Sequence, residues 1–136
     1  MNRERLKAQL TVDEGKRNKT YRCSAGYLSV GVGRNLDANG LRDSEIDFML
    51  ENDITAVEQQ LDRALPWWRK MSDARQEVLA NMTFNMGIGT MLTFKNTLKA
   101  MEQGRYADAA DGMKNSLWYH QVGDRAKRLE KMMRAG

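Results

Sequence analysis

Three side chains near the N-terminus have the types and spacing of a catalytic site. Glu14 supplies a carboxyl, Cys23 a thiol and Ser29 a hydroxyl, with eight residues between the first two and five between the last two. A protonated carboxyl can protonate a leaving group, and a thiolate or hydroxyl can attack a substrate or hold the attacking water. This spacing predicts a compact site for acid-base chemistry. The alternatives are a solvated helix-end glutamate and a small buried cysteine without chemistry.

A short helix is expected to position Glu14. Apolar residues recur at helical spacing over residues 2–12, and Gly15 is expected to end the helix. The helix dipole disfavours negative charge at a C-terminus, and partial burial would act in the same direction. We therefore expect Glu14 to keep the proton that a general acid needs.

A β-hairpin is expected to carry Cys23 and Ser29. Branched and aromatic residues alternate with small and polar ones over residues 21–32, and Ala25 and Gly26 supply the turn. Gly31 and Gly33 lack the third glycine and the βαβ context of a dinucleotide fingerprint. We interpret them as bare backbone at the floor of a cleft, where a ligand or another element comes close.

The remainder of the chain is predicted to be helical. An apolar stripe over residues 44–65 predicts the longest helix, opened by a Ser44 cap and ended by Pro66. Further helices are predicted over 72–86, 93–103, 106–114 and 124–134. Tryptophans 67, 68 and 118 are expected in the core rather than on sugar rings, and His120 in a solvated loop.

Composition indicates a small helical domain. The chain has 136 residues, 41% of them hydrophobic, with ten methionines and one cysteine, so an intrachain disulfide is excluded. A net charge of +4 favours anionic partners. The basic run 125–134 carries a packing stripe and no groove-reading motif, so no nucleic-acid role is expected. We also expect no metal, no cofactor, no signal segment, no stable membrane anchor, and a monomer.

The sequence resembles that of the phage-type lysozymes, glycoside hydrolase family 24. The pattern of that family is Glu, eight residues, Asp or Cys, five residues, Thr, which Glu14, Cys23 and Ser29 follow. The resemblance extends over nearly the whole chain, through blocks at residues 81–87, 94–98, 116–119 and 124–128.

The resemblance implies an α+β, lysozyme-like fold forming one domain over residues 1–136. A small N-terminal β-hairpin lobe (about 13–42) would be joined by a long helix (about 44–65) to a larger helical lobe (66–136). The N-terminal helix 2–12 would belong to the helical lobe.

The resemblance also implies a muramidase that cuts the β-1,4 bond between N-acetylmuramic acid and N-acetylglucosamine in peptidoglycan. Glu14 would be the general acid, Cys23 the base or nucleophile, and Ser29 would help to hold the attacking water. Residues matching family positions that bind substrate or line the cleft are Asn35, Phe84, Asn85, Thr97 and Arg125. Arg125 would pair with Glu14.

Two departures from the commonest family pattern concern the chemistry. Cys23 replaces the usual aspartate and acts only as a thiolate, which Arg22, Arg34 or Arg125 would have to stabilise. A thiolate that orients water gives inversion, whereas one that attacks the sugar gives retention; we favour inversion. Ser29 keeps the hydroxyl of threonine without its methyl group. The alternative function is a catalytically silent peptidoglycan-binding or structural descendant of the family.

The biological role implied by the resemblance is lysis of a host bacterium. The enzyme would accumulate in the host cytoplasm and act on the cell wall after the membrane is permeabilised. A holin would be needed as a partner for access to the wall.

Overall fold

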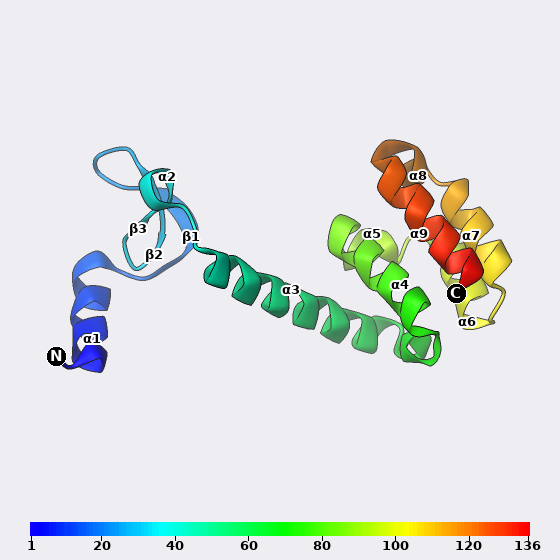
Figure 1. Cartoon of the computed structure of the whole chain (residues 1–136), viewed down its shortest axis with the longest axis horizontal. Helices are drawn as coiled ribbons and strands as arrows, with labels where there is room; N and C mark the ends of the chain where they lie inside the picture. Colours follow the sequence, from blue (N-terminus) through cyan, green and yellow to red (C-terminus); the bar gives the residue numbers. More distant parts are fainter. The chain divides into compact units, whose positions relative to one another are not determined.

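The computed structural model describes all residues, 1–136. The chain divides into two compact units, residues 1–48 and 49–136. The first contains all of the β-structure and the second is helical, so the α+β class is confirmed. Figure 1 shows the elements in chain order.

The N-terminal unit contains a helix, a small sheet and a further short helix. Its elements are α1 (Arg3–Glu14), β1 (Arg17–Arg22), β2 (Leu28–Gly31), β3 (Arg34–Asn35) and α2 (Leu36–Asn39). The side chain of Asn2 accepts the Arg5 N–H at 2.9 Å and so caps the start of α1. Gly15, with φ 77°, ends this helix as the sequence predicts.

The sheet is antiparallel with strand order β1-β2-β3, so β2 is central. Tyr21 pairs with Ser29 across β1 and β2, and Ser29 pairs with Asn35 across β2 and β3. Directly opposed residues point to the same face of a sheet. Ser29 therefore shares its face with Tyr21 and Asn35. The strand β3 and the helix α2 were not predicted.

The long helix α3 (Asp43–Ala64) begins one residue earlier than predicted and is capped by another side chain. Glu45, rather than Ser44, accepts the backbone N–H of Arg42, at 2.7 Å. Glu45 also forms two hydrogen bonds with the Arg34 guanidinium, at 2.9 and 2.5 Å. The same carboxylate thus joins the end of the sheet to the first turn of α3.

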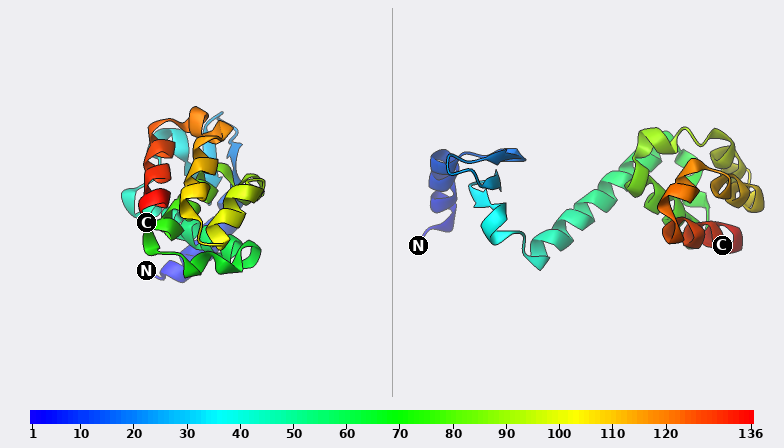
Figure 2. Two further views of the ribbon diagram at one scale, coloured as in Figure 1. Left: turned by 90° about the vertical axis from the view of Figure 1, so that its right-hand side faces the viewer. Right: turned by 90° about the horizontal axis from the view of Figure 1, so that it is seen from above.

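The second unit is a bundle of short helices around a methionine-rich core. Its elements are η1 (Pro66–Lys70), α4 (Asp73–Met86), α5 (Ile88–Met91), α6 (Lys95–Glu102), α7 (Tyr106–Lys114), α8 (Leu117–Val122) and α9 (Asp124–Ala135). The helix α9 lies beside α7 and also packs on α4 and α8 (Figures 1 and 2). Fully buried methionines confirm the predicted adaptable helical core: Met82, Met91, Met101, Met113 and Met133.

Trp68 and Trp118 are buried, as predicted, and Trp67 is partly buried against the same core. His120 is exposed as expected, but its predicted loop is wrong because the residue lies in α8. The helices η1, α5 and α8 span four to six residues each and were missed. Elements this short show too little of the helical period for sequence analysis to detect.

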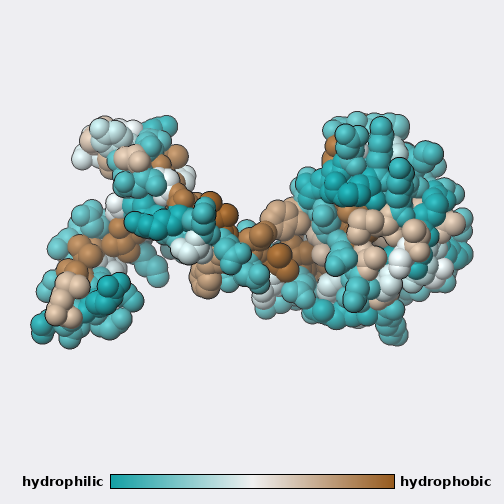
Figure 3. All heavy atoms as spheres, in the orientation of Figure 1, coloured by the Kyte–Doolittle hydropathy of each residue, from teal (hydrophilic) through white to brown (hydrophobic).

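The predicted apolar stripe of α3 is only partly buried. Val57 and Leu61 are buried, whereas Ile46, Leu50 and Ile54 are between 41% and 49% exposed. Figure 3 shows hydrophobic residues along this helix in the same view as Figure 1. None of the helices combines the length and the apolar character needed to cross a membrane.

Candidate active site

The carboxyl group of Glu14 lies against the backbone of Gly33, between β2 and β3. A Cβ atom built on Gly33 would be 2.7 Å from Glu14 Oε2 and 3.0 Å from its Cδ. Gly33 has φ 66°, so both its conformation and the close approach favour glycine. The predicted role of this glycine as bare backbone beneath another element is confirmed. The partial burial expected for Glu14 is wrong, because the residue is exposed.

Cys23 and Ser29 occupy the hairpin formed by β1 and β2. Cys23 directly follows β1, and its N–H donates to the carbonyl of Tyr27 at 2.9 Å, which continues the ladder of this hairpin. In that register Cys23 and Ser29 are diagonal neighbours on one face, about 7–8 Å apart. The thiol and the hydroxyl thus share one face of the hairpin without a direct contact, and the turn after β2 contacts Glu14.

The hydroxyl of Ser29 is available to a ligand. Ser29 is only 4% exposed, and its Oγ forms no hydrogen bond with protein atoms. Because no fully buried side-chain oxygen lacks a hydrogen-bond partner, this Oγ keeps a small contact with solvent. A hydroxyl held in the central strand with an unused hydrogen-bonding capacity is suited to position a water molecule.

Two of the arginines that were expected to stabilise a Cys23 thiolate, Arg22 and Arg34, already have partners. Arg22 donates to the Gly26 carbonyl at 3.1 Å and lies 4.0 Å from the carboxylate of Asp37. Arg34 is bonded to Glu45, and the hydrogen bond from this guanidinium lowers the pKa of Glu45 to about 2. Both guanidiniums thus have carboxylate partners, Arg34 in a close, partly buried pair and Arg22 in an exposed pair at 4.0 Å.

Asn35 has a structural role that the sequence did not indicate. Its Oδ1 accepts the Ala38 N–H at 3.0 Å and caps α2. As the direct partner of Ser29 it nevertheless lies beside the candidate catalytic hydroxyl. Its predicted contact with substrate stays a prediction.

In the second unit, Phe84 and Arg125 line the same apolar groove, which has a volume of about 350 Å³. Phe84 is 48% exposed, and Leu50 and Ile54 of α3 form part of the opposite wall. Arg125 donates from Nε to Asn81 Oδ1 at 2.9 Å, which fixes the guanidinium at the edge of the groove. The predicted pairing of Arg125 with Glu14 stays a prediction.

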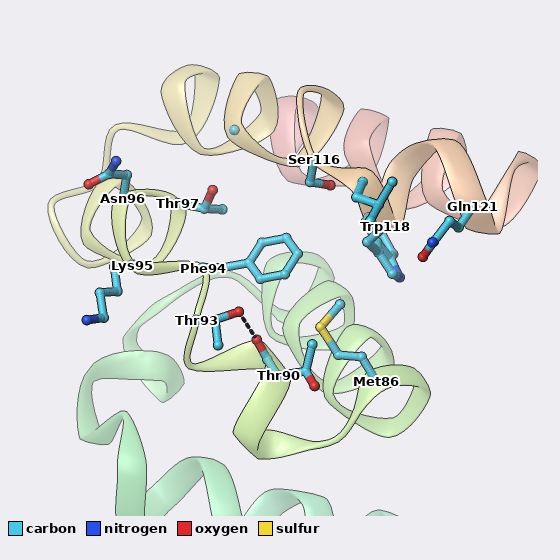
Figure 4. Close-up of a pocket in the computed structure, with 12 residues that line it drawn as sticks. Met86, Thr90, Thr93, Phe94, Lys95, Asn96, Thr97, Ser116, Trp118 and Gln121 are labelled. Atoms are coloured by element: carbon cyan, nitrogen blue, oxygen red, sulfur yellow. Dashed lines mark hydrogen bonds between the residues drawn. The ribbon is translucent and has the colours of Figure 1, made fainter.

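Thr97 and Trp118 line a second and larger pocket, of about 760 Å³. Phe94 extends between them toward the interior of this pocket (Figure 4). Thr97 is 6% exposed, and its side chain lies so close to Gly112 that a Cβ atom there would collide with it. Asn85 lies at the adjacent end of α4, where its Oδ1 accepts the indole N–H of Trp118 at 2.8 Å.

Several residues that organise these sites were not singled out from the sequence. Asp37 accepts the Leu28 N–H at 2.8 Å and ties α2 to the hairpin, while Asn81 and Trp118 orient Arg125 and Asn85. Each pair is separated by 9 to 44 residues. Sequence periodicity predicts local helices and strands, and it does not indicate which side chains distant in sequence will form hydrogen bonds.

Comparison with known proteins gives consistent matches. The sequence model of the family described as phage lysozyme matches residues 12–135. The probable T4-type lysozyme 1 of Dictyostelium discoideum is 27% identical, with 96% of this chain and 94% of that protein aligned. The peptidoglycan hydrolase gp36 of Pseudomonas phage phiKMV is 31% identical over 92% of this chain and 14% of its own length. The pre-baseplate central spike protein Gp5 of Enterobacteria phage T4 is 27% identical over 91% of this chain and 26% of its own length.

Proposed function

This chain belongs to the phage lysozyme family, and on that basis we propose that it is a lysozyme-like hydrolase of peptidoglycan. The more specific proposal is a muramidase that cleaves the β-1,4 bond between N-acetylmuramic acid and N-acetylglucosamine. The relatives named a probable T4-type lysozyme and a peptidoglycan hydrolase support the substrate class.

The observation that carries this proposal is the position of the Glu14 carboxyl against Gly33. The central strand of the same unit carries the hydroxyl of Ser29, and Cys23 lies on the same face of the hairpin in this register. Glycoside hydrolysis needs a proton donor for the leaving oxygen and a second group for the water or the sugar. The hairpin unit contains candidates for both.

In the proposed mechanism Glu14 donates its proton to the glycosidic oxygen as the C–O bond breaks. A water molecule, oriented by Ser29 and Cys23, attacks the anomeric carbon and loses its proton to solvent or to the thiolate. This route gives inversion. We prefer it to attack by sulfur because the thioglycosyl enzyme that such an attack forms would be slow to hydrolyse.

The substrate-binding residues form a further part of the proposal. Phe84 offers an exposed ring for a sugar face, and Arg125 a fixed guanidinium beside it. The hydroxyl of Thr97 is a donor in the second pocket, and the amide nitrogen of Asn85, next to the pocket residue Met86, is a further donor for substrate. Asn35 would contact saccharide beside Ser29.

Hydrolysis of purified peptidoglycan by the full chain tests the proposal. Replacing the proton donor, Glu14→Gln, should lower the rate by about 10²–10⁴-fold, the usual contribution of a general acid. Mass spectrometry of borohydride-reduced products should find the new reducing end on muramic acid. Binding of peptidoglycan without turnover by the unmodified protein would instead establish the catalytically silent alternative.

Proton NMR of the first product distinguishes the two stereochemical routes. The inverting route predicts the anomer opposite to the substrate bond before mutarotation. A covalent adduct of sugar mass on Cys23 would overturn inversion without affecting the assignment of Glu14. We further propose that lysis of a host bacterium is the biological role, with a holin giving the enzyme access from the cytoplasm to the wall.

A further inference from the structure

A pocket of about 540 Å³ lies in the helical unit apart from the residues assigned above. One wall comes from Leu65 and Trp67 at the start of η1, and the other from one face of α6 with the preceding Leu92. Leu65 and Leu98 form a buried apolar floor, being 8% and 6% exposed. Its volume is within the range of ordinary ligand pockets, about 300–1,000 Å³.

Trp67 belongs to a short helix that is bonded to the end of α3. The indole N–H of Trp68 donates to Asp62 Oδ1 at 2.7 Å, and Arg69 binds the same carboxylate at 2.8 Å. Arg69 also stacks over the Trp68 ring at 4.6 Å. Trp67, next to them, is only partly buried against the core. Its ring therefore offers an accessible aromatic wall.

Two lysines without ion pairs stand beside this ring. Lys95 and Lys99 are one turn apart on α6, are exposed, and take part in none of the ion pairs of the chain. Lys95 lies between the two pockets and lines both, and its side chain extends away from Phe94 in Figure 4. Like charges at this spacing repel each other and slightly destabilise a helix. An anionic ligand would remove that repulsion.

We propose that this pocket is a second binding site for peptidoglycan, in which a sugar ring stacks on Trp67 and a carboxylate of the muramyl or peptide substituent pairs with Lys95 and Lys99. The inference rests on the proposed function for its substrate class. Glu102 and Gln103 supply acceptors and donors for hydroxyl groups at the rim. A second contact on a polymer raises the effective concentration of the substrate at the first site.

The shape of the pocket favours a sugar over a lipid surface. Insertion into a bilayer requires apolar side chains that protrude, whereas Trp67 is partly buried and Leu65 and Leu98 are buried. A pocket with an aromatic wall, buried leucines and polar groups at its rim accepts one ring-sized group.

Sedimentation with insoluble peptidoglycan, using the full chain carrying Glu14→Gln, tests this site. The double change Lys95→Glu and Lys99→Glu takes the net charge from +4 to 0, since each substitution subtracts two charges. The matched control, Lys127→Glu and Lys131→Glu, alters two exposed lysines one turn apart on α9 and gives the same net charge. We expect the first pair to weaken binding at least about fivefold more than the control, at the modest end of avidity effects.

Tryptophan fluorescence provides a second readout that does not depend on charge. Trp67 lines this pocket, whereas Trp118 lines the pocket of Thr97, so soluble disaccharide-peptide fragments bound at the two pockets change the emission of different tryptophans. The part of the change that comes from Trp67 should disappear in Trp67→Phe, and circular dichroism melting of each variant verifies the fold. The proposal is overturned if the two double-lysine variants lose peptidoglycan binding equally. It is also overturned if the fragments leave the emission of Trp67 unchanged.

Vesicles containing phosphatidylglycerol distinguish the alternative ligand. If the variant with Lys95→Glu and Lys99→Glu no longer binds these vesicles but still binds peptidoglycan, the site recognises anionic lipid and the proposal is wrong. The muramidase proposal is tested separately, because it fails only if the unmodified chain does not hydrolyse peptidoglycan. A protein that binds through α6 but does not hydrolyse would retain this site and lose the muramidase proposal.

Discussion

At the residue scale, the position of the Glu14 carboxyl depends on a neighbour without a side chain. Gly33→Ala would place a methyl group 2.7 Å from Glu14 Oε2 and force the carboxyl away. Because a displacement of about 1 Å can cost about 10²-fold in rate, we expect a loss of that order. Peptidoglycan hydrolysis at saturating substrate measures it.

Gly31→Ala is the matched control for that substitution. Gly31 has φ 67°, against 66° for Gly33, but a Cβ atom there meets no heavy atom within 4 Å. Both variants therefore carry the same backbone cost of about 1–2 kcal/mol. Equal activity losses in the two variants would mean that strain of the turn, rather than the contact with Glu14, is responsible.

The role of the Cys23 thiol is separable from that of Glu14. Cys23→Asp restores the commonest residue of the family pattern and is expected to stay active, since a carboxylate can also act as the base. Cys23→Ala removes any base and should lower the rate, with the folded state verified by thermal melting. Unchanged activity of the alanine variant would remove the thiol from the mechanism and leave Ser29 to hold the water.

At the scale of elements, the junction between β3 and α3 depends on the ionisation of Glu45. The hydrogen bond from Arg34, followed by that from the Arg42 N–H, lowers the pKa of Glu45 from 4.5 to about 2. A lowered pKa in the folded state means that the carboxylate adds stability above pH 4.5 and that this stability is lost as the pH falls toward 2. The side chain is about one-third exposed, so salt will reduce the effect.

Melting temperatures of the unmodified chain and of Glu45→Gln, measured from pH 7 to pH 2, test this junction. The unmodified chain should be more stable at pH 7, and its advantage should decrease between about pH 4.5 and 2, where Glu45 gains its proton. A difference between the two proteins that does not vary with pH would show that the ionised pair does not stabilise the fold.

Elements with strong local signals were predictable from the sequence, and those built by distant contacts were not. Ser72 caps α4 and Gly15 ends α1 where their residue types indicate. The start of α3 was displaced because Arg34, eleven residues earlier, engages the carboxylate that caps it. The helix α8 has six residues, and its Trp118 finds its partner 33 residues away.

At the scale of the whole molecule, the residues of the candidate site could be predicted from the sequence, but the ion pairs that surround them could not. Glu14, Cys23 and Ser29 follow from spacing and resemblance, and all three lie within the first 29 residues of one unit. The pairing of Arg22 and Arg34 with carboxylates depends on α2 and α3, which no local pattern connects to the hairpin. Electrostatics around the thiol could therefore be described only from the folded chain.

The net charge of +4 leads to a prediction for the whole protein on its polymeric substrate. Carboxylates make peptidoglycan anionic, so long-range attraction should help the enzyme reach it and should decrease with ionic strength. Between roughly 0.1 and 1 M salt the screening length falls from about 10 to about 3 Å. We expect KM for insoluble peptidoglycan to rise several-fold over this range, while hydrolysis of an uncharged soluble chitooligosaccharide changes little. If both substrates respond equally, salt acts on the fold or the catalytic groups, and the net charge has no part in substrate capture.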